Sequence, residues 1–334
     1  MVQQLLVIAR NTFVESIRQP IFVVLLLLGT AMLVLNMSLS AFTMSDDNKI
    51  LVDMGLSTLF IVGLALSAFT ATGVLSAEVE NRTVLTVVSK PVPRPLFVLG
   101  KYLGVAVALG MAFWTLMQVF LLTVRHQVLQ RATDQIDQPV IVLGLLAAVV
   151  ALLGSTLANY FYRWVFTSTF TYAFFITSTL AFLLVLMINK QWQFQSVMTD
   201  LDPQLVLTLL LVFEAVLILT AVAITCSTRL GQVMTLVICV LVFLLGLIGH
   251  YFSTQADKTI GNIADSFVHQ LLYWLVKAFF FLVPNFQYLW QADALTQGHP
   301  ISGGHVLVLS LYSVLYISAV LCLAVALFQS REVG

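Results

Sequence analysis

Long apolar segments dominate the hydropathy pattern of the chain. A helix needs about 20 apolar residues to cross a hydrocarbon core about 30 Å thick. Runs free of Asp, Glu, Lys and Arg reach that length eight times, if a single acid, Glu214, is allowed inside one of them. The predicted spans cover about 20–43, 55–77, 102–124, 139–161, 166–189, 204–227, 231–252 and 304–328. The pattern predicts an all-α, polytopic membrane helix bundle with about eight transmembrane helices.

Two further segments are apolar along only one side of a helix. Residues 1–19 predict an N-terminal amphipathic interfacial helix that ends before Pro20. Its apolar stripe comprises Val2, Leu5, Leu6, Ala9, Phe13 and Ile17. A signal peptide is the alternative, but no obvious small-x-small cleavage site is present. Residues 266–290 predict an external interfacial or re-entrant helix before the last span. A ninth span is the alternative there, although Lys277 and Pro284 interrupt its apolar run.

Composition narrows the class of protein. Of the 334 residues, 60% are apolar and 9% are charged, whereas a soluble domain is about half apolar and about a quarter charged. These values exclude a soluble enzyme, a disordered chain and a nucleic-acid binder. A membrane enzyme would need acids, histidines or a nucleophile gathered at one membrane depth, and the sequence shows no such cluster. No metal-ligand spacing is present either.

The distribution of positive charge predicts the orientation. With eight spans, both termini share a side, and the positive-inside rule favours the cytoplasm for that side. Nine cations then fall inside: Arg10, Arg18, Arg82, Lys90, Arg94, Lys101, Arg163, Arg229 and Arg331. Six fall outside: Lys49, Arg125, Arg131, Lys190, Lys258 and Lys277.

Small residues at helical spacing recur in three of the predicted spans. Examples are Gly63 in the second, Gly104 in the third and Gly154 in the fourth. Small residues allow membrane helices to approach closely. Packing within the chain and a dimer interface explain them equally well.

The longest loop on the expected cytoplasmic side is 78–101. Its first half can form a short helix, about 80–88, whose apolar side comprises Val84, Leu85 and Val88. Three prolines then exclude helix and stiffen the chain: Pro91, Pro93 and Pro95. A rigid element with an apolar edge and flanking charges is suited to docking on another protein. A solvated loop whose charges only set the orientation is the alternative.

This loop resembles the cytoplasmic coupling segment of type-two ATP-binding-cassette (ABC) transporter permeases, the exporter-type membrane subunits. The matching positions are Glu78, Glu80, Thr83, Leu85, Ser89, Pro91, Val92, Arg94, Gly100, Lys101, Leu103 and Gly104. The amphipathic N-terminal helix and the last span resemble the same family. The common family plan has six spans, so the extra pair would lie within 125–203.

The resemblance implies a division of labour between two kinds of subunit. The permease performs no chemistry, and ATP and Mg bind to a separate ABC ATPase, so no cofactor is expected in this chain. In agreement, the sequence lacks a G-x-x-x-x-G-K-[ST] phosphate loop. The resemblance further implies a second permease copy or homologue as a partner, and a bacterial cytoplasmic (inner) membrane with both termini on its cytoplasmic side.

The resemblance also assigns roles along the chain. The residues expected to couple to the ATPase are Glu78, Glu80, Arg82, Thr83, Val84, Leu85, Val88, Pro91, Arg94 and Lys101. Glu78 and Glu80 could instead cap the short helix. The expected organisation is an elbow helix (1–19), the first two spans (20–77), the coupling segment (78–101), the middle spans (102–252), an external segment (253–303) and the last span with a cytoplasmic tail (304–334).

Glu214 is the only acid deep inside a predicted span. An intramembrane acid is costly and rarely faces lipid, so it is a candidate functional residue. Contact with substrate, pairing with a neighbouring helix and burial in the protonated form are all open. Two alternatives to an exporter subunit remain as well. One is an ATP-driven membrane subunit that transmits force to a periplasmic partner without cargo, and the other is an ion-coupled secondary transporter.

Overall fold

A computed structural model describes the chain except for residues 42–46, 81–92, 130–134, 260–266 and 330–334. Within the described residues, regular structure is helical apart from one isolated bridge between Ile188 and Phe194. Eight of these helices are long and apolar enough to cross a membrane: α2 (Pro20–Ser40), α3 (Asp47–Glu80), α5 (Arg94–His126), α6 (Gln138–Tyr162), α7 (Phe166–Met187), α8 (Pro203–Ser227), α9 (Gln232–Thr259) and α13 (Gly303–Gln329). The predicted all-α polytopic bundle is confirmed.

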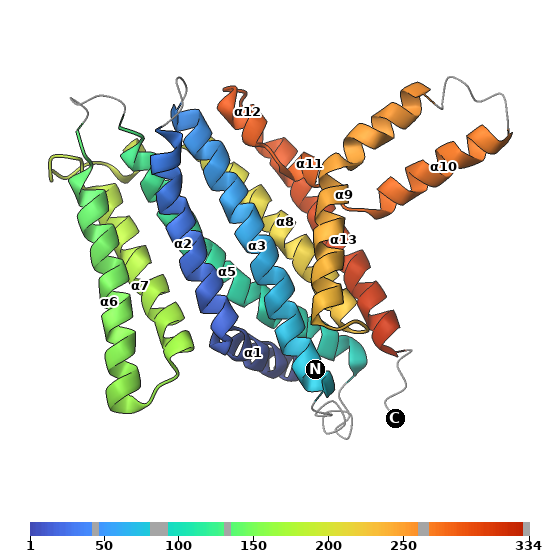
Figure 1. The fold of residues 1–334 in the computed structure, drawn as a ribbon, viewed down its shortest axis with the longest axis horizontal. Coiled ribbons are helices and arrows are strands. Elements are labelled where there is room, and N and C mark those ends of the chain that lie inside the picture. Colours follow the sequence, from blue (N-terminus) through green and yellow to red (C-terminus); the bar gives the residue numbers. More distant parts are fainter. Residues whose placement is uncertain (42–46, 81–92, 130–134, 260–266, 330–334) are drawn as a thin grey trace.

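The remaining helices lie at the ends of the bundle or beside it. They are α1 (Val2–Arg18), the 3-10 turn η1 (Val197–Thr199), α10 (Phe267–Leu282), α11 (Phe286–Leu289) and α12 (Ala292–Thr296). Figure 1 shows α1 across one end of the bundle, with the C-terminal end of α13 at that same end of the bundle and α12 at the opposite end. We refer to these as the α1 end and the α12 end.

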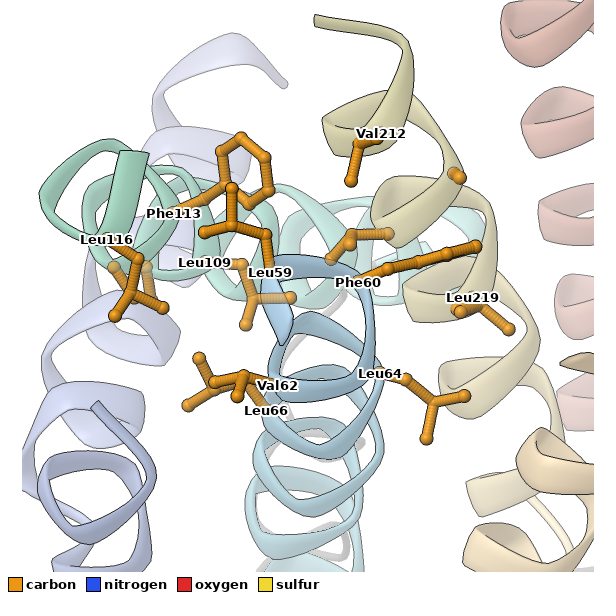
Figure 2. Packing of buried hydrophobic residues seen from close by; sticks show 14 of the residues in the cluster. Leu59, Phe60, Val62, Leu64, Leu66, Leu109, Phe113, Leu116, Val212 and Leu219 are labelled. Atoms are coloured by element: carbon orange, nitrogen blue, oxygen red, sulfur yellow. The ribbon is translucent and has the colours of Figure 1, made fainter. Parts of the chain in front are cut away.

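The core forms where α3 lies between α5 and α8 (Figure 2). Buried apolar side chains from the three helices pack together there; they include Leu59, Phe60, Val62, Leu109, Phe113, Leu116, Val212 and Leu219. A Cβ atom on Gly63 would lie 2.5 Å from Cγ2 of Val216 on α8. This glycine therefore serves packing within the chain, whereas a Cβ on Gly154 of α6 would meet nothing within 4 Å.

The α6–α7 pair lies at the edge of the bundle (Figure 1). Hydrogen bonds across the helices hold α7 to α5: Ser178 Oγ donates to Gln118 Oε1 at 3.0 Å, and Gln118 Nε2 donates to Thr179 Oγ1 at 2.9 Å. Most apolar side chains of α6 point outward, with Leu145 62% exposed. In a membrane protein that outward surface is suited to lipid or to another membrane helix.

Several helix limits differ from the predicted ones. Helix α5 begins at Arg94 rather than near 102, so Pro95, Gly100 and Lys101 are helical. The expectation that Pro95 excludes helix is wrong, because the first-turn N–H groups of a helix have no intrahelical acceptor and Pro is tolerated there. Helix α9 runs on to Thr259, past the predicted limit at 252. Helix α10, with 16 residues, is not among the eight spans.

Candidate functional site

The predicted coupling segment lies between the end of α3 and the start of α5, and both lie at the α1 end of the bundle (Figure 1). The described residues include only part of it. Glu78 and Glu80 are helical residues at the described end of α3, and Arg94 and Lys101 belong to the first turns of α5. The other expected coupling residues lie outside the described residues: Arg82, Thr83, Val84, Leu85, Val88 and Pro91. The short helix expected over 80–88 falls there too.

Arg94 joins the start of α5 to the end of α13. Its Nη1 donates a hydrogen bond of 2.6 Å to the carbonyl oxygen of Gln329. The rings of Phe97 and Phe328 stack beside this bond, with centroids 5.5 Å apart. The last four carbonyls of a helix have no intrahelical donor, and positive charge near them is favourable. Arg94 thus caps the last helix of the chain.

A second arginine binds the same helix end. Arg229, in the turn between α8 and α9, donates from Nε to the carbonyl oxygen of Leu327 at 3.0 Å. The C-terminus of α13 is therefore bonded to two different parts of the chain, the start of α5 and the α8–α9 turn.

Lys101 faces α1 rather than solvent. It is 3% exposed, its Nζ lies 3.5 Å from Oε2 of Glu15, and the same Nζ lies 5.6 Å from the ring centre of Phe97. The expected direct contact of Lys101 with an ATPase does not fit this position, because α1 covers the side chain. Lys101 instead connects the start of α5 to the N-terminal helix.

Two glycines next to Lys101 form the surface on which α1 rests. A Cβ atom on Gly100 would lie 2.7 Å from Cγ2 of Ile8, and one on Gly104 would lie 2.5 Å from the carbonyl oxygen of Ala9. Only glycine allows α1 to approach this closely. The Gly-Lys-x-Leu-Gly pattern thus forms the surface on which α1 packs, although it was expected only to lead out of the coupling segment. The four-residue spacing of its glycines is the sequence feature that could have predicted this close helix contact.

The face of α1 that packs on α5 differs from the predicted apolar stripe. Thr12 and Ser16 are fully buried, whereas Val2 and Leu6 are 70% and 62% exposed. Helix α1 therefore presents Ile8 and Thr12 to the glycines of α5, buries Ile17 of the predicted stripe, and keeps Val2 and Leu6 on its outer surface. In a membrane, those outward side chains are positioned for the lipid interface.

Glu214 pairs with a neighbouring helix, one of the three possibilities left open by the sequence. Ser310 Oγ on α13 donates to Glu214 Oε1 at 2.6 Å. The second oxygen, Oε2, is buried and has no hydrogen-bond partner among the described residues. Helix α13 is therefore bonded to α8 inside the bundle, in addition to its hydrogen bonds with Arg94 and Arg229 at the α1 end.

A charged cluster at the α12 end was not expected from the sequence. The side chain of Arg125, at the end of α5, is 7% exposed; its Nε lies 3.2 Å from Asp137 Oδ2 and its Nη1 lies 3.3 Å from Asp200 Oδ2. It also donates to the carbonyl oxygens of Val185 and Ile188 at the end of α7. The cluster therefore connects α5 to the α6–α7 pair. The only sequence feature that could have indicated it is a single arginine at the end of a long apolar run.

The described residues contain no group of three His, Cys, Asp or Glu side chains that could hold a metal ion. Comparison of the chain with protein-family models and with curated proteins found no match. The argument for function therefore rests on the geometry of the α1 end and on the sequence of the 78–101 loop.

Proposed function

We propose that the chain is the membrane-spanning permease subunit of an ATP-driven ABC exporter, driven through residues 78–101 by a separate ATPase subunit. One observation carries the proposal: the start of α5 is bonded to both the first and the last helix. Lys101 pairs with Glu15 of α1, and Arg94 donates to Gln329 of α13. A displacement of the loop would pass directly to these two helices.

The contacts of α13 extend this path into the bundle. At the α1 end, α13 is bonded through Gln329 and Leu327, and further along it is bonded through Ser310 to Glu214 of α8. Movement of the α13 end would therefore act on α8, one of the core helices. Such a path is what a permease needs to convert closure of an ATPase into rearrangement of its membrane helices.

ATP and Mg belong, in this proposal, to the partner ATPase. A second permease copy or homologue would complete the translocation path, and the outward apolar face of α6 offers surface for lipid or for such a partner. The same geometry would serve a subunit that passes force to a periplasmic partner, because the path through α13 does not depend on cargo.

Co-purification with ATP hydrolysis tests the proposal. The tagged chain is purified from membranes of the cells that naturally produce it, and MgATP hydrolysis in the eluate is measured. The variant Leu85→Asp places a charge on the expected docking edge, and loss of one apolar anchor is expected to lower ATPase recovery about 30-fold.

Phe161→Asp is the matched control, because Phe161 is 69% exposed in the last turn of α6, and α6 ends at the α1 end of the bundle (Figure 1). It is expected to retain the ATPase. If no ATPase accompanies the unaltered chain, or if Leu85→Asp retains it fully, the proposal is wrong.

Glu214 favours a second candidate, an ion-coupled secondary transporter, since it is an intramembrane acid whose Oε2 is buried and has no hydrogen-bond partner in the part of the chain that the structure describes. In that case a pH gradient alone, without ATP, would drive a fluorescent amphiphilic dye across vesicles that contain only this chain. Glu214→Gln keeps the size of the side chain and an oxygen for Ser310, yet it would abolish the flux. Absence of gradient-driven flux in the unaltered protein would exclude this candidate.

A further inference from the structure

The turn between α6 and α7 carries a cluster of exposed aromatic side chains at the α1 end of the bundle (Figure 1). The side chains of Tyr160, Phe161, Tyr162 and Trp164 are each more than half exposed. Their rings contact one another in pairs: the centroids of the first two lie 5.1 Å apart, and those of the last two lie 5.7 Å apart. We refer to residues 160–164 as the aromatic turn. None of them belongs to the proposed coupling path.

The aromatic turn joins two helices that are long and apolar enough to cross a membrane. Helix α6 ends at Tyr162 and α7 begins at Phe166, so only residues 163–165 separate them. The two helices are bonded partway along their length, where Thr177 Oγ1 donates to the carbonyl oxygen of Ala147 at 3.0 Å. The 25 residues of α6 rise about 37 Å, which exceeds a hydrocarbon core of about 30 Å. Because the chain turns back between two such helices, the aromatic turn lies at a membrane surface.

Hydrogen bonds fix the shape of the aromatic turn. Arg163 adopts the left-handed conformation that ends α6, with a φ of 56°, and its backbone N–H donates to the carbonyl oxygen of Asn159 at 3.0 Å. The Asn159 side chain donates from Nδ2 to the carbonyl oxygen of Trp164 at 2.6 Å. At the start of α7, Thr167 Oγ1 donates to the carbonyl oxygen of Arg18 at 2.9 Å, which places the end of α1 beside the turn. The aromatic side chains therefore project from a defined backbone.

The polarity of the outward surface of α6 changes in a fixed order toward the turn. Leu153 and Leu157 are exposed and apolar, and Tyr160 and Phe161 follow them at helical spacing. Arg163 is exposed and comes next, as the only charged residue in the sequence from 138 to 187. From the centre of a bilayer outward, the layers follow the same order: hydrocarbon, the boundary where Tyr and Trp are enriched, and the headgroups. The surface thus matches these layers and carries positive charge at the level of the headgroups.

We infer that the aromatic turn is a membrane anchor that binds the headgroup of an anionic phospholipid. The rings of Tyr160, Tyr162 and Trp164 lie at the boundary between acyl chains and headgroups. Arg163 contacts the phosphate, because arginine near a membrane surface attracts anionic headgroups and its planar fork fits phosphate oxygens. Arg18 is exposed at the adjoining end of α1 and adds a second positive charge. The inference does not depend on coupling to an ATPase.

Fluorescence quenching tests where the turn lies. The purified full-length chain and its Trp164→Phe variant are placed in phosphatidylcholine vesicles, and the difference between their emission isolates the signal of Trp164. A nitroxide quencher is carried either on the lipid headgroup or near the end of the acyl chains, and iodide is the quencher in water. We expect the headgroup nitroxide to quench Trp164 most strongly. Trp114→Phe provides the matched control, because Trp114 is partly exposed near the middle of α5 and should favour the acyl-chain quencher.

A second series tests whether charge selects the lipid. Phosphatidylglycerol or phosphatidylcholine, labelled with nitroxide at the same position, is added as a trace lipid. One arginine near a membrane surface favours an anionic lipid about fivefold, so phosphatidylglycerol should quench Trp164 at about one fifth of the concentration. Arg163→Gln is expected to remove this factor, and Arg163→Lys to retain it. Lys190→Gln is the control, because Lys190 is exposed in the loop after α7, at the α12 end (Figure 1).

Four outcomes would overturn the inference. Strongest quenching of Trp164 by iodide would mean that the turn lies in water, and strongest quenching by the acyl-chain nitroxide would place it in the hydrocarbon core. Weak quenching by all three, with Trp114 quenched normally, would mean that protein covers the turn, such as a second copy of the chain. Equal quenching by the two trace lipids, or no effect of Arg163→Gln, would mean that charge does not select the lipid.

Discussion

Arg125 is a membrane-helix arginine with several partners at once. Its side chain is 7% exposed and lies against Asp137, whose side chain is fully buried, and against Asp200. Asp137 also accepts from the backbone N–H of Val140 at 3.3 Å, so it caps α6. A single cation therefore forms ion pairs with two acids and donates to the carbonyls that end α7.

Removing this cation should destabilise the α12 end. Arg125→Ala would leave Asp137 buried and without its cation, and breaking a buried ion pair from one side costs about 3–5 kcal/mol. We expect a clearly lower thermal unfolding midpoint in detergent, followed by intrinsic fluorescence. Arg163→Ala is the control, because Arg163 is exposed in the α6–α7 turn. Equal midpoints for the two variants would contradict this account of Arg125.

At the scale of single residues, the sequence identified the unusual side chains but not their partners. Glu214 stood out because an acid deep in a span is costly, yet Ser310 lies 96 positions away along the chain. Lys101 was expected at a partner surface because the pattern around it resembles a coupling motif. Its burial depends on α1, whose position on α5 cannot be read from local spacing.

Helix α1 rests on α5 at a surface that only small side chains permit. Gly100 and Gly104 let the backbone of α1 approach, and the Lys101–Glu15 ion pair adds a charged contact beside them. Because α5 begins at Arg94, this contact lies within the first three turns of α5 and includes Gly100 and Lys101, the last two residues of the predicted coupling segment. Helix α1 therefore packs directly on the end of the predicted coupling segment.

Two glycines of α5 provide a matched test of this contact. A Cβ on Gly104 would lie 2.5 Å from the carbonyl oxygen of Ala9, whereas one on Gly110 would lie 3.5 Å from Cζ of Phe213, an ordinary contact. We expect Gly104→Ala to cost about 1–3 kcal/mol of stability. Gly110→Ala should be neutral or stabilise by up to about 1 kcal/mol, since Ala favours helix.

The measurement for both variants is thermal unfolding, combined with limited proteolysis near the N-terminus. Release of α1 should make Arg10 and Arg18 cleavable by trypsin in Gly104→Ala alone. If both variants behave alike, close approach of α1 to α5 is not what holds that helix in place.

At the scale of helices, hydropathy located the spans because each must be apolar over its whole membrane depth. It located their ends less well. Helix α5 begins at Arg94, before the predicted start near 102, and therefore includes Arg94 and Lys101. Charged residues can remain helical there because other helices pack against them. Pro95 was misleading for a different reason: the first turn of a helix tolerates proline, because its N–H groups have no intrahelical acceptor.

The whole molecule brings its first and last helices to one end. Eight spans require both termini to share a side, and Figure 1 places both ends of the described chain there. The sequence could predict this coincidence from the number of spans alone. It could not predict that Arg94 and Arg229 both bind the end of α13, because contacts over 235 and 98 positions depend on the packing of the complete bundle.

Site-specific photo-cross-linking tests the central claim most directly. A photoreactive amino acid is introduced at position 85 within the coupling segment, at Phe161 on the same end of the bundle, or at Gln191 in the loop after α7. Cross-linking is performed in native membranes, and the adducts are identified by mass spectrometry. The proposed docking edge predicts an adduct at position 85 with a protein that carries an ATP-binding phosphate loop, and no such adduct at the control positions Phe161 and Gln191. An ATPase adduct at Gln191 but not at position 85, or no ATPase adduct at any position, would contradict the account.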